Sequence, residues 1–93
     1  YSYAYNNRGL AKANLGDYEG AIKDYTKAIE LDPNYSYAYS NRSVSKENLK
    51  DFKGAKEDYK KAIALDPDNE LAKKNFENLE NRGYKKYFRK IFK

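Results

Sequence analysis

Residues 2–35 read SYAYNNRGLAKANLGDYEGAIKDYTKAIELDPNY, and residues 36–69 follow directly as SYAYSNRSVSKENLKDFKGAKEDYKKAIALDPDN. The two stretches carry the same amino acid at 20 of their 34 positions. A repeat of this length is typical of stacked architectures, in which each unit is one supersecondary element that buries its apolar face against its neighbours. The sequence therefore predicts a repeat protein.

Each unit has the pattern of two helices. Apolar and small residues recur three and four positions apart, as on one face of an amphipathic helix. A proline, which cannot continue a helix interior, ends the second helix of each unit, Pro33 in the first and Pro67 in the second. Gly16 and Lys50 are expected in left-handed backbone between the helices, and Asp17 is expected to cap the second helix. The predicted helices are residues 2–15, 18–31, 36–49 and 52–65.

The expected core combines small residues with a few large ones. Small side chains let neighbouring helices approach at Gly9, Ser43, Ala21, Ala55, Ala28 and Ala62, while buried area comes from Tyr25, Tyr59, Leu31 and Leu65. A fifth helix over residues 68–82 buries Leu71, Ala72, Phe76 and Leu79, and it caps the stack with a polar outer face. The sequence offers no reason why Gly20 and Gly54 recur inside predicted helices.

These residues resemble a known family. Gly9, Ala21 and Ala28 with Tyr5, Tyr18, Tyr25 and Pro33 are similar to the tetratricopeptide repeat pattern, and the second unit repeats it through Tyr39, Ser43, Phe52, Ala55, Tyr59, Ala62 and Pro67. The resemblance implies an all-α fold of antiparallel helix-turn-helix pairs stacked as a right-handed superhelix, an α-solenoid fragment. The expected parts are repeats at 1–35 and 36–69, a capping helix at 70–83 and a basic amphipathic helix at 84–93.

The resemblance also implies a site. The first helix of each pair would line a concave groove, which the family uses to bind peptides and partner proteins. The residues expected there are Tyr3, Asn6, Asn7, Leu10, Asn14, Tyr37, Ser40, Asn41, Val44 and Asn48, together with Ala13 and Glu47. Asparagine can pair with a peptide backbone through donors and acceptors, and tyrosine is favoured at interfaces. The alternative interpretation is a polar helix surface without a ligand.

Some relatives bind the C-terminal tails of chaperones through a clamp of lysine, arginine and asparagine. Here Asn41 matches one clamp position, and the others hold Asn6, Leu10, Leu71 and Asn75. A doubly charged carboxyl terminus would find no cation at any of these positions. Asn7 occupies the place of Asn41 in the first unit, so Asn41 is interpreted as a feature of the repeat.

The net charge of +5 resides in the C-terminal tail. Residues 1–84 contain equal numbers of acidic and basic side chains, and the cations of the tail are Lys85, Lys86, Arg89, Lys90 and Lys93. Tyr84, Tyr87, Phe88, Ile91 and Phe92 would form the opposite, apolar face of a helix. Three interpretations stay open: packing within the chain or on another copy, binding of an anionic membrane or acidic partner, and, as the weakest, binding of nucleic acid.

The composition argues against catalysis. The chain has no histidine or cysteine, no phosphate-binding glycine loop and no carboxylates at calcium-loop spacing. Acidic residues such as Asp17, Asp24 and Asp32 are expected in caps and on charged faces. We expect a soluble, cytoplasmic binding module or scaffold with no cofactor and no metal. Tyr1 matches Tyr35, so we expect a fragment of a longer array, with possible self-association through the uncapped first helix.

Overall fold

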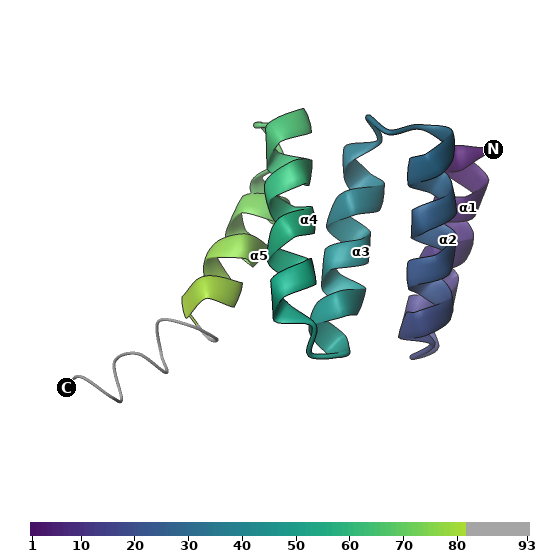
Figure 1. Cartoon of the computed structure of the whole chain (residues 1–93), viewed down its shortest axis with the longest axis horizontal. Coiled ribbons are helices and arrows are strands. Elements are labelled where there is room, and N and C mark those ends of the chain that lie inside the picture. Colours follow the sequence, from purple (N-terminus) through teal and green to yellow (C-terminus); the bar gives the residue numbers. More distant parts are fainter. Residues whose placement is uncertain (82–93) are drawn as a thin grey trace.

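The computed structural model describes residues 1–81, and this part of the chain is built from helices (Figure 1). The helices are α1 (Ser2–Asn14), α2 (Tyr18–Leu31), α3 (Ser36–Asn48), α4 (Phe52–Leu65) and α5 (Glu70–Glu80). No strand occurs within residues 1–81, which confirms the predicted all-α class. None of these helices is long and apolar enough to cross a membrane.

The helices begin and end at the residues that the sequence marks. The Asp17 carboxylate accepts a hydrogen bond from the Gly20 N–H at 2.9 Å, and Asp51 accepts one from Gly54 at 3.0 Å. Gly16 and Lys50 have φ angles of 85° and 67°, the left-handed backbone predicted for both. Lysine is strained in this conformation because of its Cβ atom, whereas glycine adopts it freely.

The same caps explain why glycine recurs at positions 20 and 54. A Cβ atom on Gly20 would collide with the carboxylate of Asp17, and one on Gly54 would collide with that of Asp51. A side chain at either position would therefore require the capping carboxylate to shift. The cost of glycine inside a helix, about 0.5–1 kcal/mol relative to alanine, is balanced by a cap worth about 1 kcal/mol.

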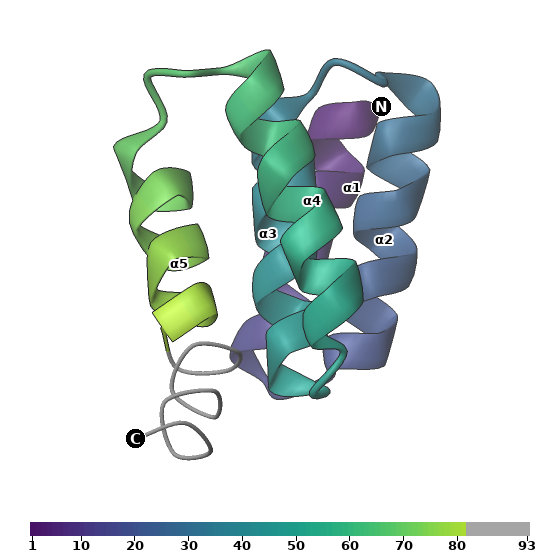
Figure 2. The same ribbon diagram turned by 60° about the vertical axis from the view of Figure 1, so that its left-hand side comes forward.

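The helices stack in chain order. α1 packs on α2, α3 on both α2 and α4, and α5 on α4 (Figure 2). Small residues allow this approach: Ala21, Ala28, Ala38, Ala55, Ala62 and Ala72 are completely buried. Gly9 leaves room for the ring of Tyr25, because a Cβ atom there would lie 2.6 Å from the ring carbon Cε1. These contacts position α1 and α3 side by side.

Two predictions about large apolar residues are wrong. Leu31 is half exposed, and Leu71 is 66% exposed. In α5 it is Ala72 and Leu79 that are buried, with Phe76 partly buried against Tyr59. Leu71 and Ala72 are adjacent and so point in directions about 100° apart on a helix, which prevents both from facing the core.

Buried ion pairs join the two helices of each unit, contrary to the expectation that Asp24 lies on a charged face. Asp24 and its equivalent Asp58 are buried. Asp58 accepts hydrogen bonds from Arg42 at 2.7 and 2.8 Å, and Asp24 accepts bonds of 2.8 and 2.7 Å from Arg8. The lysine one turn beyond each arginine completes the pair, Lys12 in α1 and Lys46 in α3. A carboxylate thus replaces an apolar side chain at the centre of each helix pair.

Candidate functional site

The residues expected in the groove divide by exposure. Tyr3, Asn7, Leu10, Asn14, Tyr37, Val44 and Asn48 are exposed, and Asn41 is partly buried. Asn6 and Ser40 are buried, so the expectation that they are accessible to a ligand is wrong. The Asn6 amide lies between α1 and α3, where it contacts Asn41.

Asn6 is buried because its amide joins the two units. It donates a hydrogen bond to the Tyr35 hydroxyl at 3.3 Å and accepts one from Asn41 at 3.0 Å. The Asn41 carbonyl oxygen takes part in no hydrogen bond within residues 1–81. Asn41 therefore has one end fixed against α1 and an acceptor left for another partner.

Tyrosine hydroxyls gather at one end of this chain of hydrogen bonds. Burial raises the pKa of Tyr35, while its bond from Asn6 opposes that shift. The hydroxyls of Tyr3 and Tyr37 lie close enough to contribute to the same pKa shift. Tyr3 and Tyr37 are 69% and 59% exposed, respectively, so both tyrosines face solvent.

Helical spacing extends the surface from this centre. Tyr3 and Leu10 lie one turn to either side of the Asn6–Asn7 pair on α1, and Tyr37 and Val44 flank Asn41 in the same way on α3. We call this face the odd-helix surface; it consists of five exposed residues, Tyr3, Asn7, Leu10, Tyr37 and Val44, and the partly buried Asn41. It consists of two apolar rows separated by a row of asparagines.

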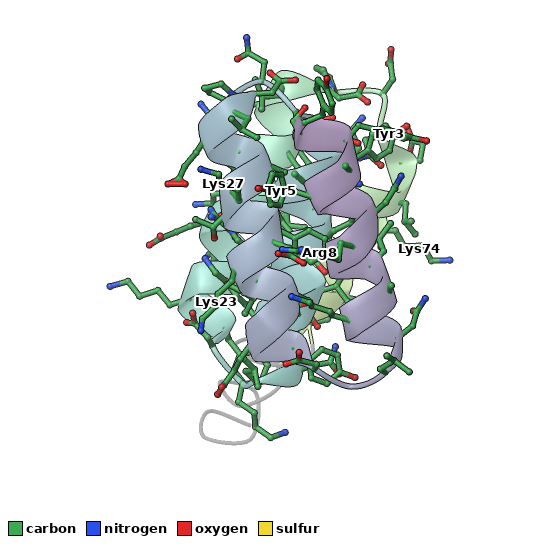
Figure 3. The ribbon with its side chains drawn as sticks, turned by 90° about the vertical axis from the view of Figure 1, so that its right-hand side faces the viewer. Tyr3, Tyr5, Arg8, Lys23, Lys27 and Lys74 are labelled. Atoms are coloured by element: carbon green, nitrogen blue, oxygen red, sulfur yellow. The ribbon has the colours of Figure 1, made fainter. Side chains whose placement is uncertain are left out.

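Helix α5 continues the surface. Tyr3, Tyr37 and Leu71 follow one another at the repeat spacing of 34 residues, and all three are exposed. Figure 3 shows Tyr3 and Lys74 on the same side of the molecule, opposite Lys23 and Lys27. The prediction had left out Tyr35 and Lys74 and had placed Leu71 only in the core and at a clamp position. The repeat spacing, continued to α5, would have indicated Leu71 and Lys74.

Some predicted residues are engaged within the chain. Glu47 accepts a hydrogen bond from the Tyr59 hydroxyl at 2.7 Å, and Asn48 donates one to the Val44 carbonyl at 2.9 Å. The basic tail, Lys85 to Lys93, lies outside the described residues, so its prediction stays open. Within residues 1–81 there is no group of three or more acidic side chains that could hold a metal ion.

A separate hollow lies at the N-terminal end of the stack. It measures about 280 Å³ and is lined by Tyr1, Ala4, Tyr5 and Arg8. Figure 3 shows two of these residues, Tyr5 and Arg8, beside α1 and α2. In the second unit Ala38, the equivalent of Ala4, is completely buried, and α3, which carries it, packs on α2 as well as on α4. The hollow is thus the part of α1 that corresponds to a helix contact in the second unit.

Comparisons with known proteins agree with the geometry. Family models described as tetratricopeptide repeat match residues 2–35 and residues 36–69. The chain belongs to the tetratricopeptide repeat family. A comparison with curated protein sequences finds no significant match.

Solved tetratricopeptide repeat domains have the same fold. The second such domain of human RPAP3, in complex with the HSP70 peptide SGPTIEEVD, superposes with a TM-score of 0.82 at 32% identity over 85% of this chain. The first tetratricopeptide repeat domain of Spaghetti, bound to the HSP90 peptide SRMEEVD, superposes with a TM-score of 0.85 at 27% identity over 88% of this chain. The TPR2B domain of yeast Sti1, in a pHsp70 complex, superposes with a TM-score of 0.84 at 27% identity over 87% of this chain. This chain spans 66%, 65% and 65% of their respective lengths.

Proposed function

We propose that the chain is a protein-interaction module and that the odd-helix surface binds an extended segment of a partner protein. The observation that carries this proposal is the exposed set Tyr3, Leu10, Tyr37 and Val44 around the Asn6–Asn41 hydrogen bond. These four side chains are exposed, and other residues fill the core of the helix stack. Tyrosines and aliphatic side chains supply contact area, and a hydrogen-bonded asparagine holds a polar group in place.

The solved relatives support peptide binding as the function. Two of them hold a peptide, and they share the fold over more than four fifths of this chain. The clamp residues differ, however, because Asn6, Leu10, Leu71 and Asn75 provide no positive charge. We therefore propose peptide binding of the same general kind, with different side-chain chemistry in the ligand.

A display selection with random-sequence peptides tests the proposal. Peptides that bind the chain are measured by fluorescence anisotropy against Tyr3→Ala and Tyr37→Ala. Each variant should lose about tenfold in affinity, the usual effect of removing a well-packed interface tyrosine. Tyr1→Ala and Leu15→Ala are the controls, because both remove exposed side chains of similar size at other places on or beside α1.

The outcomes separate clearly. Unchanged binding in the controls with loss in both tyrosine variants supports the proposal. The proposal fails if no peptide binds, or if Tyr1→Ala abolishes binding while Tyr37→Ala does not. The latter result would place the ligand in the N-terminal hollow.

A further inference from the structure

The cations of α1, α3 and α5 are already occupied, with one exception. Residues 1–81 place six basic side chains on these helices. Arg8 and Lys12 pair with Asp24, Arg42 and Lys46 with Asp58, and Lys73 with Glu70. Lys74 forms no ion pair with any carboxylate of residues 1–81. Acidic side chains of residues 1–81 therefore pair with five of the six basic side chains that α1, α3 and α5 contribute.

Lys74 makes the α5 end of the surface differ in charge from the α1 and α3 part. Lys74 follows Ser40 by the repeat length and lies on the same side of the molecule as Tyr3 (Figure 3). The α1 and α3 part of the surface offers only neutral asparagines and apolar side chains. Within residues 1–81, a negative charge in a ligand on this surface thus has an unpaired cation at the α5 end and none over α1 and α3.

A free carboxyl terminus preceded by acidic side chains does not suit such a surface. Such a ligand brings two or more negative charges, but the described part of the surface offers one unpaired ammonium group, that of Lys74. The remaining carboxylates would lose their hydration without gaining a cationic partner, and this is costly in free energy. Apolar side chains suit it better, because Tyr3, Leu10, Tyr37 and Val44 present an apolar area that a ligand would cover. Asn7 and Asn41 provide neutral partners for the ligand backbone.

We infer that the ligand is an internal segment of a partner protein with bulky apolar side chains over α1 and α3. It carries at most one acidic side chain, which contacts Lys74. This inference rests on the proposed function of the odd-helix surface and names the chemistry of its ligand.

Two pools of random-sequence peptides provide the test, one with free carboxyl termini and one with amidated termini. Both pools are selected on the full chain and on the Lys74→Ala and Lys73→Ala variants. The expected result is the same apolar consensus from both pools, with equal affinity for free and amidated forms of one peptide. Lys74→Ala should weaken only peptides with an acidic residue, by about two- to fivefold, as for an exposed ion pair.

Lys73→Ala is the matched control, because the neighbouring lysine is already paired with Glu70 and should have no effect. The inference is overturned if the selected peptides end in acidic residues and amidation costs about tenfold or more, the effect of losing a charged hydrogen bond. If those acidic peptides still require Tyr37, the proposed function stands and only the ligand chemistry is wrong. If they bind without Tyr37, or if no peptide binds, both fail.

Discussion

Because the arginine–aspartate pair occurs in both units, the same substitution, arginine to methionine, can be made at two equivalent positions and its effects on stability compared. Arg42 and Arg8 occupy equivalent positions, but the Arg42 side chain is 17% exposed and that of Arg8 is 60% exposed. The difference has a structural cause: Arg42 also donates a hydrogen bond to the Thr26 hydroxyl at 3.1 Å, where α2 covers it. We expect Arg42→Met to destabilise the fold far more than Arg8→Met.

The magnitude follows from what remains around Asp58. Without Arg42, this buried carboxylate keeps only Lys46, at 3.0 Å. Removing one partner of a buried ion pair costs about 3–5 kcal/mol, and the remaining lysine places the cost at the lower end, about 3 kcal/mol. For a domain of this size that lowers Tm by roughly 12–24 °C. Arg8→Met should give a much smaller shift, because solvent reaches the Arg8 side chain and screens its interaction with the buried Asp24, which also keeps Lys12.

Thermal unfolding followed by circular dichroism measures both variants. A double variant, Arg42→Met with Asp58→Leu, adds a control, since replacing both partners by apolar residues should recover most of the loss. Equal shifts for Arg8→Met and Arg42→Met would refute the reasoning. So would a double variant as unstable as Arg42→Met alone, because the loss would then not come from an unpaired carboxylate.

Three further predictions concern stability. Hydrogen bonding from Arg8 holds the pKa of Asp24 below its ordinary value of 3.8. The ionised Asp24 therefore stabilises the fold fully above that value, and this contribution to the free energy of unfolding is lost as pH falls through the lower, folded-state pKa. Acid titration of unfolding should show a shallower loss of stability in Asp24→Asn, and an identical pH dependence would contradict this. Ala28→Leu should cost about 1–3 kcal/mol by overpacking a completely buried position, and an unchanged Tm would exclude it. Ser45 buries a hydroxyl without a partner in residues 1–81, so Ser45→Ala, which installs the residue found at Ala11, should gain about 1 kcal/mol in urea unfolding; a loss would show that the hydroxyl is bonded.

The helices could be predicted because their boundaries are local. Gly16, Asp17 and Pro33 act on the backbone within a turn or two, so the sequence alone indicates where each helix begins and ends. The repeat spacing then transfers each boundary to the second unit. Even the strained Lys50 was predictable from its alignment with Gly16.

Burial of polar residues could not be predicted in the same way. Asp24 is buried because Arg8, sixteen residues earlier, reaches it from another helix, and Asn6 is buried because Asn41 comes from the next unit. A single helix pattern shows neither partner. The recurrence of Arg8 and Asp24 as Arg42 and Asp58 was the available signal.

The candidate site was predictable in outline. Exposure of Tyr3 and Tyr37 follows from their positions off the apolar stripe, whereas Leu71 was assigned to the core because leucine usually fills it. The close approach of the Asp17 carboxylate to Gly20 exists only in the folded cap. For this reason the sequence alone does not explain why glycine occurs at position 20.

A nuclear magnetic resonance titration of the full chain with a selected peptide tests the central proposal most directly. Binding at the odd-helix surface should shift the backbone amide resonances of Tyr3, Leu10, Tyr37 and Val44 and the side-chain amide of Asn41. Shifts confined to residues on the opposite side, such as Lys23 and Lys27, with these resonances unchanged, would contradict it.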